Sequence, residues 1–485
     1  MTAARFDWAA DALVCPAGGF RSRRQREKAC KQARVRLAWW RIMGAKSFVV
    51  ALIGLGIVAF GVSNAGAQVT PVIASCSYYV ALTGSDSSAG TQASPFRTIQ
   101  HSVNSLGSAG GTICIEDAGP YAEAVTLSAS GTAGRWLAIR GIAAARAEIS
   151  PPSSGSFAIN INSQSYIAIE HVQINGGEIG IVSSGGGSHW YVGDDEIENA
   201  SGSGVQLNNG DYLTIVGSLV HNNAATWSND GSGISVYEPT QLDSSAGTHV
   251  YIGANFVYDN SNPSGGTDGN GILLDSFADS GFTASSLIEN NVGYSNASAC
   301  IKVYANGGAP TLIRNNTCYK NQQLITQYTW RGEISLEYSD DVTTVNNILW
   351  FDPTADSSNS AYLDGGDSGP ANVAVSNLSY GGSGSSNPDL VSPPSNMRLQ
   401  SGSPAIGSGT TAYGIPTLDI TGAARSTKSV DIGAYAFGAA SATPTPAATV
   451  TPTPVATPTA RPTATATQAP TPTPTRTPFG RGHRR

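Results

Sequence analysis

Four octapeptides share one pattern and indicate the fold: IAIEHVQI (167–174), WYVGDDEI (190–197), LTIVGSLV (213–220) and VYIGANFV (250–257). Apolar residues occupy the first, third and eighth positions of each. In weaker copies farther along the chain the sixth position is Asn, at Asn291, Asn316, Asn347 and Asn377. Successive sixth positions are 23, 23, 37, 36, 25, 31 and 30 residues apart. Short strands that recur at such spacings indicate a repeat architecture.

The repeat predicts an all-β solenoid of parallel strands. Each period holds short alternating strands that are separated by Gly and Asn at the corners. Stacked coils pair their backbone groups with the coils above and below, about 4.8 Å apart. Asn at a recurrent corner can adopt the left-handed conformation and bond to the neighbouring backbone. A propeller is excluded because its blades need about 40–45 residues, and spacings of 23 residues are too short.

The two ends of this region fit a solenoid as well. Apolar residues in 95–106 fall at helical spacing and predict a short amphipathic helix over the open first coil. Together with Tyr78–Ser85 and Gly111–Ile115, this segment resembles the start of secreted bacterial right-handed parallel β-helix proteins of the pectate-lyase-like superfamily. Met397–Ile406 and Asp431–Tyr435 resemble their closing segment. The resemblance implies a right-handed parallel β-helix over about residues 77–438. It implies little about chemistry, because the superfamily includes lyases, hydrolases, epimerases and adhesins.

Four segments are predicted along the chain. Residues 1–42 are a basic extension or precede the true start at Met43. Residues 43–67 have the order of a signal peptide: a lysine, an apolar run and a small-x-small site, with an uncleaved anchor as the alternative. Residues 68–442 form the β-helix domain, and 443–485 are a Pro/Thr-rich linker and basic tail. We therefore expect a protein that is secreted or held at the cell surface, with no stable membrane span after cleavage.

The charge of the predicted β-helix limits its partners. Residues 47–442 contain 11 basic and 31 acidic residues, a balance of −20, and no basic stripe. Such a surface disfavours nucleic acid. We expect a polysaccharide as the partner and a monomeric protein.

Four cysteines lie in the exported part, where disulfides are permitted. Cys76 and Cys114 lie at the edges of strand-like runs and are the predicted pair. Cys300 and Cys318 are interpreted as free buried thiols.

The strand after each corner predicts an outer face. Aligned inward positions are Val205, Ile234, Ile272, Ile301 and Ile334. The next outward positions are Gln206, Ser235, Leu273, Lys302 and Ser335, followed by Asn208, Tyr237, Asp275, Tyr304 and Glu337. These side chains are predicted to share one solvent-facing sheet. Asp275 and Lys302 should lie within several ångströms of each other, because they belong to adjacent coils.

Two Asp-Gly corners flank this face. Asp230 and Asp268 occupy equivalent positions on successive coils, whose periods of 37 and 36 residues exceed the 23 to 31 residues found elsewhere. The surplus residues predict loops that form the walls of a groove.

The leading hypothesis is an exported lyase that cleaves a uronate-containing polysaccharide by β-elimination. Between residues 147 and 397 there are four basic residues, among them Lys302 and Arg331. In calcium-dependent lyases of the superfamily that the chain resembles, acidic side chains hold the ion and a Lys or Arg takes the proton. The resemblance makes Lys302 the candidate base and Arg331 a clamp for the substrate carboxylate. The candidate Ca²⁺ ligands are Asp230, Asp268 and Asp275.

Further residues are assigned to substrate binding, and other functions stay open. The candidate binding residues are Tyr237, Tyr304, Glu337 and, at the flank of the groove, His221. A glycoside hydrolase would draw its acid and base from Asp268, Asp275 and Glu337. A uronate epimerase on the same fold is a further alternative, and so is a non-catalytic carbohydrate-binding or cell-surface protein. In that last case Lys302 would be an ordinary surface ion pair.

Overall fold

The computed structural model describes residues 69–225, 231–263, 268–324, 331–367, 369–382 and 385–438. The chain divides into two units, Met1–Gly61 and Val62–Arg485, and every described residue belongs to the second. The predicted signal peptide, the basic extension and the Pro/Thr-rich tail lie outside the described residues, as does Asp230. None of the helices in the described ranges is long and apolar enough to cross a membrane.

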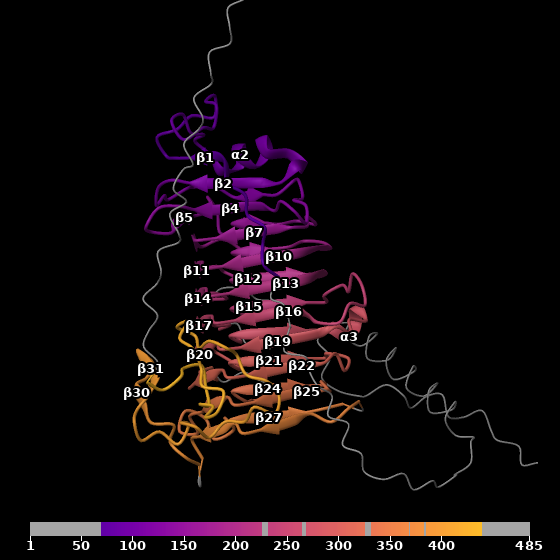
Figure 1. Cartoon of the computed structure of the whole chain (residues 1–485), viewed down its shortest axis with the longest axis vertical. Coiled ribbons are helices and arrows are strands. Elements are labelled where there is room, and N and C mark those ends of the chain that lie inside the picture. The colour runs from indigo at the N-terminus through magenta and orange to yellow at the C-terminus, as the bar shows by residue number, and fades with distance from the viewer. Residues whose placement is uncertain are drawn as a thin grey trace, which may run out of the picture. The chain divides into compact units, whose positions relative to one another are not determined.

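Three parallel sheets form a solenoid, numbered here in the order in which each coil visits them (Figure 1). Sheet 1 consists of β1 (Cys76–Val80), β2 (Gly111–Ile115), β4 (Leu137–Gly141), β7 (Ile167–Glu170), β10 (Gly187–Gly193), β13 (Gly210–Val216), β16 (Thr248–Gly253), β19 (Ser285–Glu289), β22 (Thr311–Arg314), β25 (Val342–Val345) and β28 (Val373–Val375). Neighbouring strands of a sheet come from successive coils, so the predicted stack of parallel rungs is confirmed.

The other two sheets follow the same rule. Sheet 2 consists of β5 (Ala147–Ile149), β8 (Val172–Asn175), β11 (Glu196–Glu198), β14 (Leu219–His221), β17 (Phe256–Tyr258), β20 (Val292–Tyr294), β23 (Thr317–Tyr319), β26 (Ile348–Trp350) and β29 (Leu378–Tyr380). Sheet 3 consists of β3 (Val125–Thr126), β6 (Ile159–Asn160), β9 (Ile181–Val182), β12 (Val205–Asn208), β15 (Ile234–Tyr237), β18 (Ile272–Asp275), β21 (Ile301–Tyr304), β24 (Ile334–Glu337) and β27 (Tyr362–Gly365).

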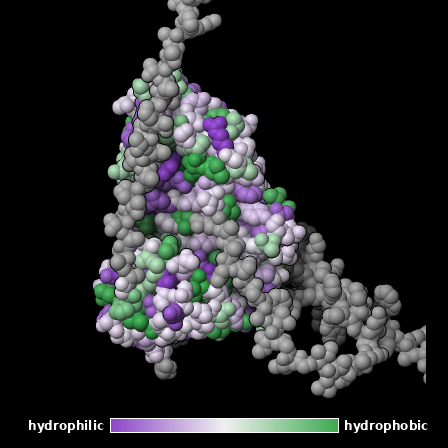
Figure 2. Space-filling model, viewed as in Figure 1, coloured by the Kyte–Doolittle hydropathy of each residue, from purple (hydrophilic) through white to green (hydrophobic). Residues whose placement is uncertain are grey.

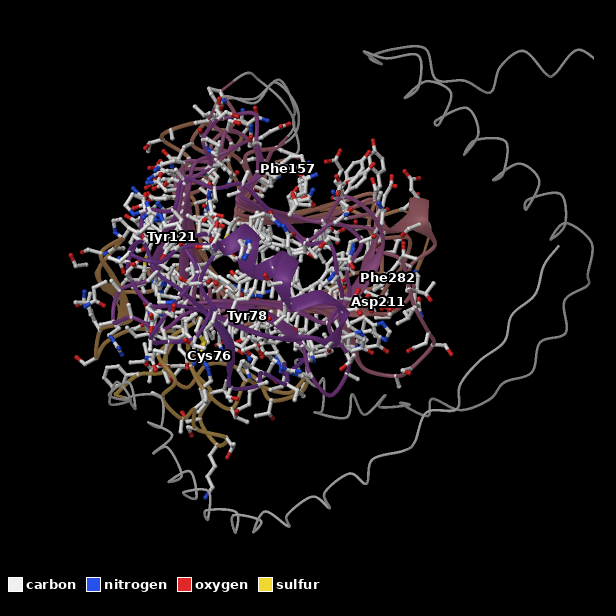
Figure 3. The ribbon with its side chains drawn as sticks, turned by 90° about the horizontal axis from the view of Figure 1, so that it is seen from above. Cys76, Tyr78, Tyr121, Phe157, Asp211 and Phe282 are labelled. Carbon is white, nitrogen blue, oxygen red and sulfur yellow. A yellow bond between two sulfur atoms is a disulfide. The ribbon has the colours of Figure 1, made fainter. Side chains whose placement is uncertain are left out.

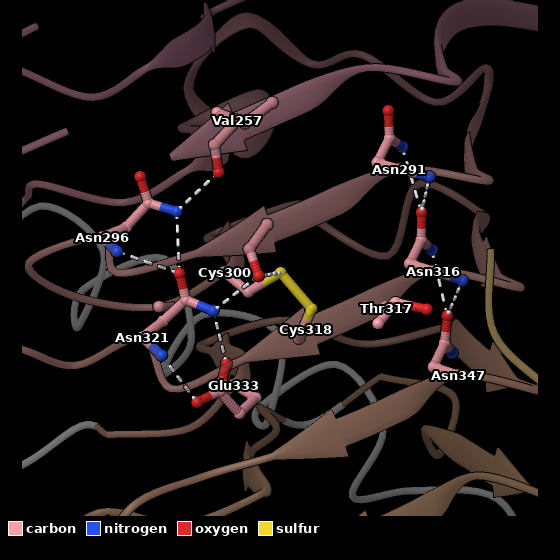
Figure 4. Close-up of a disulfide and its surroundings, with 12 residues drawn as sticks. Val257, Asn291, Asn296, Cys300, Asn316, Thr317, Cys318, Asn321, Glu333 and Asn347 are labelled. Carbon is pink, nitrogen blue, oxygen red and sulfur yellow. Dashed lines mark hydrogen bonds between the residues drawn. A yellow bond between two sulfur atoms is a disulfide. The ribbon is translucent and has the colours of Figure 1, made fainter. Parts of the chain in front are cut away.

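Each coil turns from sheet 1 to sheet 2 at a tight corner. The residue after the sheet 1 strand adopts positive φ in coil after coil, for example 56° at Asp194 and 56° at Asn290. The following position is the sixth position of the repeat. There the backbone N–H and Nδ2 of Asn255 both donate to Oδ1 of Asn291, each at 3.0 Å. The ladder continues through Asn316, Asn347 and Asn377, and Figure 4 shows it at Asn316 and Asn347. The predicted bonding between neighbouring coils is confirmed, but the left-handed residue is the one before each ladder position and not the ladder Asn itself.

A second ladder, which the sequence analysis did not find, follows sheet 2. Asn223, Asn260, Asn296 and Asn321 bond in series in the same way. The series ends on Glu333, whose carboxylate accepts the backbone N–H of Asn321 at 3.0 Å and its Nδ2 at 2.6 Å (Figure 4). Glu333 is fully buried, and burial raises its pKa to about 8.

Inward-facing strand residues form one continuous apolar core. Val205, Ile234, Ile272, Ile301 and Ile334, the predicted inward column of sheet 3, are at most 1% exposed. Full burial of each such side chain contributes about 1.5–3 kcal/mol. Because every coil buries such side chains, this contribution to the free energy of folding is repeated along the stack.

A short helix covers the first coil. Helix α2 (Ile99–Leu106) lies beside β1 and β2 in Figure 1, and Ile99 and Val103 are buried in the core. It begins later than the apolar spacing suggested, because Thr98 is its N-cap and accepts a hydrogen bond from the backbone N–H of His101. A single 3₁₀ turn, η1 (Gly107–Ala109), follows, and α3 (Phe277–Ser280) lies in the loop after β18.

Two disulfides connect neighbouring coils. Cys76–Cys114 joins β1 to β2, as predicted. The interpretation of Cys300 and Cys318 as free thiols is wrong, because they form a disulfide with Cα atoms 5.8 Å apart (Figure 4). Both residues are buried. The sequence did not predict the pair, because alternation within one strand gives no information on positions that are separated by two corners of the coil.

The C-terminal part of the domain covers the later strands of sheet 2. β30 (Leu390–Ser392) and β31 (Asn396–Leu399) form an antiparallel pair. Met397, Leu399 and Ile432 pack in one cluster with Val292 and Ile348 of sheet 2. These are the segments that resembled a closing element. On the face in Figure 2, hydrophobic residues occur in small groups among hydrophilic ones.

Candidate functional site

The outer face of sheet 3 has the predicted register. Tyr237 pairs with Asp275, Asp275 with Tyr304, and Tyr304 with Glu337. Lys302 occupies the adjacent column of outward positions. The strands therefore bring together five candidate residues that lie far apart in sequence.

Lys302 forms an ion pair with Glu337 on the next strand. Its Nζ lies 2.9 Å from Oε2 of Glu337, and the two side chains are only 8% and 12% exposed. Burial is the largest single influence on the pKa of Lys302 and lowers it, whereas the charge and hydrogen bond of Glu337 raise it. The charges of Asp268 and Asp275 add to this effect, so the pKa of Lys302 lies above its ordinary value.

The expectation that this face is solvent-facing is wrong at Lys302, which is 6% exposed as a whole residue. Its column neighbours Leu273 and Ser335 are buried too. Alternation predicted that these side chains point away from the core, but it did not predict that they are buried. A lysine held as an ammonium ion by Glu337 is a poor proton acceptor, which weakens the assignment of Lys302 as a base.

The two candidate tyrosines differ in their contacts. The ring centroid of Tyr304 lies 5.6 Å from Nζ of Lys302, a cation–π distance. Burial and the Glu337 charge raise the pKa of Tyr304 to about 12. The Tyr237 hydroxyl donates to Oε1 of Glu238 at 2.6 Å, and burial with this bond raises its pKa.

The described carboxylates do not form a compact calcium site. Asp268 accepts a weak hydrogen bond from Asn270 at 3.4 Å, and Asp275 accepts one from the Ser276 hydroxyl at 2.8 Å. Within the described ranges, the sole set of three potential ligand atoms that converge is that of Cys300, Cys318 and Glu333. Its sulfurs are joined in a disulfide. The calcium expectation therefore stays a prediction that depends on Asp230, outside the described residues.

Arg331 and His221 do not join the face of sheet 3 in the expected way. Nη1 of Arg331 donates to Asp356 at 3.0 Å and to Asn359 at 3.2 Å, so its guanidinium holds the loop of the next coil. The expectation that His221 flanks the groove is wrong. It is the last residue of β14 and pairs with Tyr258 in sheet 2, one corner before the chain enters sheet 3.

A buried His–Asp pair fixes the loop that follows Tyr237. Nδ1 of His249 lies 2.8 Å from Oδ1 of Asp211, and Nε2 lies 3.1 Å from the carbonyl oxygen of Ser245. The other oxygen of Asp211 accepts the backbone N–H of Leu242 at 2.6 Å. In the view from above in Figure 3, Asp211 lies on the same side of the solenoid as Phe282. The ring of Phe282 contacts the ring of His249. One wall of the sheet 3 face is therefore anchored by polar contacts.

Sequence reasoning missed a second polar group, on the first strands of sheet 2. Glu148, Gln173 and Glu196 lie side by side on β5, β8 and β11. The sequence did contain a signal for this group. Polar residues alternate with apolar ones in Val172–Asn175 and Glu196–Glu198, and this alternation marks the outward positions of two strands. These side chains line a cavity of about 580 Å³.

Comparison with known proteins supports the fold. A family model described as "Right handed beta helix region" matches residues 157–349. The solved structure of pectate lyase Pel9A is 20% identical, with a TM-score of 0.47 over 74% of this chain and 96% of that chain. An alginate lyase from Paenibacillus sp. str. FPU-7 is 17% identical, with a TM-score of 0.38 over 58% of this chain and 96% of its own.

A third structure with this likeness is the A-module of the mannuronan C-5 epimerase AlgE4 from Azotobacter vinelandii. It is 16% identical, with a TM-score of 0.31 over 62% of this chain and 96% of that module. No curated protein sequence matches the chain. The family-model match and the stacked parallel sheets show a right-handed parallel β-helix.

Proposed function

We propose that the chain is a polysaccharide-cleaving enzyme whose site is the Lys302 cluster: Lys302, Asp268, Asp275, Tyr304 and Glu337. The observation that carries the proposal is the nearly buried ion pair between Lys302 and Glu337 on the outer face of a solenoid. Its desolvation makes such a pair a weak source of stability. Two further carboxylates surround the same ammonium group. Charges gathered in this way are typical of functional sites.

The arrangement of Asp275 and Glu337 supports glycoside hydrolysis. They occupy one column, two strands apart, with Tyr304 between them. Parallel strands lie about 4.8 Å apart, which places these Cα atoms about 9–10 Å from each other. Inverting glycoside hydrolases hold their two carboxyl groups roughly 6.5–9.5 Å apart, with room for a water molecule. The side chains of this pair can span that range.

The charges then suggest a role for each carboxyl group. Oε2 of Glu337 lies 2.9 Å from Nζ of Lys302, which fixes the position of this carboxyl group, and Glu337 is the proposed base that takes a proton from the attacking water. Asp275 is the proposed acid that gives a proton to the glycosidic oxygen as the C–O bond breaks. The net negative charge of the cluster suits an uncharged polysaccharide.

A second candidate is β-elimination on a uronate-containing polysaccharide, with Lys302 as the base. Its support is the position of Lys302 between the strands of Asp275 and Glu337, where a substrate carboxylate could replace Glu337 as its partner. This reaction requires Lys302 to lose a proton that Glu337 now stabilises. It therefore needs a substrate that separates the ion pair, or a cation that neutralises the acidic side chains.

The products distinguish these candidates. The chain is incubated with neutral polysaccharides, pectate and alginate, with and without Ca²⁺ or a chelator. Hydrolysis yields reducing ends without ultraviolet absorbance, whereas elimination yields both. We expect Glu337→Gln to abolish the reducing ends. Binding without cleavage of every polysaccharide would support a non-catalytic protein and contradict the proposal.

We propose export as well. Two disulfides in the described domain are typical of an oxidising compartment, and the sequence of residues 43–67 predicts a signal peptide. Sequencing the N-terminus of protein collected from the medium of an expressing bacterium should give Gln68. Retention of an uncut chain in the cytosol would contradict this proposal.

A further inference from the structure

The first coils carry a cavity on sheet 2, a different sheet from that of the Lys302 cluster. Its volume is about 580 Å³, within the range of small-molecule sites. One wall is formed by small residues of the loops before β3 and β5, among them Gly119, Ala144 and Ala145. The rest of the lining consists of Arg146, His171 and outward side chains of β5, β8 and β11. The C-terminal segment packs on the later strands of this sheet.

Hydrogen-bonding groups on this wall are held by their neighbours. Glu148 accepts hydrogen bonds from Ser150 at 2.7 Å and from Asn175 at 3.1 Å. The amide nitrogen of Gln173 donates to Glu198 at 2.8 Å. The strands fix the spacing of these groups, and the contacts fix their orientation. Rigid elements with such supporting contacts provide a preorganised site.

The rim of the cavity is equally ordered. Arg146 donates to the carbonyl and the Oδ1 of Asp194 at 2.7 and 2.9 Å, and it lies 3.5 Å from Glu196. Nδ1 of His171 lies 2.7 Å from Oδ2 of Asp194, and its Nε2 lies 3.2 Å from the carbonyl oxygen of Ala143. Both basic side chains are therefore engaged by acceptors of the protein itself.

These contacts exclude most classes of ligand. The described residues of the lining include no Phe, Tyr, Trp or branched aliphatic side chain, so an apolar ligand would find little to contact. The carboxylates of Glu148 and Glu196 repel an anion, while Arg146 is already paired. Within the described ranges, no three ligand atoms converge here to hold a metal ion. A ligand rich in hydroxyl groups fits, because carboxylate and amide oxygens accept from hydroxyls and the guanidinium and amide N–H groups donate to them.

We infer that this cavity on sheet 2 is a second ligand site, which binds an uncharged saccharide through Glu148, Gln173 and Glu196. The inference does not depend on the reaction proposed for the Lys302 cluster, since binding is measured directly. The site lies on a separate face and gives the protein a second contact with a glycan.

The test is isothermal titration calorimetry of the full chain with cellotetraose, xylotetraose, mannotetraose and maltotetraose, and with glucosamine and trigalacturonate as charged probes. A Glu337→Gln background prevents turnover during the titration. We expect one of the neutral tetrasaccharides to bind. Ala145→Trp, in an exposed loop at the cavity wall, should weaken this binding at least tenfold by filling the space.

Ala133→Trp is the matched control, because Ala133 is equally exposed and lies in a loop that does not line the cavity. It should bind the tetrasaccharide as the parent does. Equal binding by the Ala145→Trp and parent proteins would overturn the inference, and so would binding of glucosamine or trigalacturonate alone. Loss of polysaccharide cleavage in Glu337→Gln with binding retained would show that the two sites are independent.

Discussion

The Nζ of Lys302 lies 2.9 Å from a carboxylate oxygen of Glu337 on the neighbouring strand, and both side chains are almost buried. The solenoid core does not require this pair, since both residues lie on the outer face of sheet 3. The contact with Glu337 helps to raise the pKa of Lys302, which favours the protonated lysine. Glu337 is therefore a better candidate for the general base than Lys302.

Removing the charge of Glu337 tests this assignment. Glu337→Gln should lower kcat at least about a hundredfold, the usual range for loss of a general base. It should also destabilise the protein, by up to about 3–5 kcal/mol, because the buried Lys302 loses its hydrogen-bonded carboxylate. Lys302→Met combined with Glu337→Leu should restore the urea midpoint without restoring activity. Full activity of the Glu337→Gln variant would contradict the assignment of Glu337 as the base.

Asp195 occupies the ladder position that later coils give to Asn, and replacing it should stabilise the protein. Its Oδ1 accepts the backbone N–H of Val172 at 2.9 Å, while its Oδ2 is buried without a partner. Burial raises the pKa of Asp195 well above its ordinary value. The wild type therefore loses stability as the pH rises from about 4 through the raised pKa. Asp195→Asn should gain about 1–3 kcal/mol in urea unfolding at pH 8 and less at pH 4.

The reverse change is the control for that prediction. Asn255→Asp places a carboxylate at a central position of the same ladder, where Asn255 donates to Ile215 and Asn291. It should destabilise the protein, and more at pH 8 than at pH 4. Equal unfolding midpoints of wild type and Asp195→Asn at pH 8 would contradict the account of the ladder.

Glu333, at the end of the second ladder, should make stability depend on pH. Burial raises its pKa to about 8, whereas an unfolded glutamate titrates near 4.3. Its contribution is complete below about pH 4 and is lost as the pH rises to about 8, by at most about 1.4 kcal/mol per unit. Glu333→Gln should flatten this slope in urea titrations from pH 5 to 8. Glu178→Gln, a half-buried glutamate on an earlier coil, should leave it unchanged.

His249 should anchor the wall of the sheet 3 face in a pH-dependent way. Both ring nitrogens face acceptors, Asp211 and the Ser245 carbonyl, so the charged imidazolium satisfies both. Burial is the largest single influence on the pKa of His249 and lowers it, but Asp211, the Ser245 carbonyl and Asp243 together outweigh burial, so the pKa is raised. The stabilisation is therefore complete below about pH 6.5 and is lost as the pH rises through the folded pKa.

Hydrogen exchange of the loop at residues 238–247 measures this effect. Exchange should accelerate from pH 6 to pH 9 beyond the intrinsic chemical rate, and Asp211→Asn should make the loop exchange rapidly at both values. The groups that face His249 are Asp211, Asp243, Ser245, Tyr212 and Phe282. Protection that is the same in wild type and Asp211→Asn would rule out the anchor.

The disulfide and the second ladder show what a repeat pattern leaves undetermined. Cys300 lies just before β21 of sheet 3 and Cys318 lies in β23 of sheet 2, and Glu333 takes the place of a ladder Asn just before β24. Neither follows from alternation within a strand. His221 shows the same limit, because its residue type does not reveal whether the chain has already turned the corner into sheet 3.

The sequence by itself determined the solenoid, the Asn255 ladder and the register that places Asp275, Tyr304 and Glu337 in one column. These follow from local rules: alternate residues of a strand face opposite sides, and a repeated corner restarts each strand at an equivalent position. Only the tertiary structure decided that Lys302 is buried against Glu337 and that polar side chains of sheet 2 enclose a cavity. Burial and ion pairing depend on how loops from different coils pack over the strands, and no periodicity within a single coil contains that information.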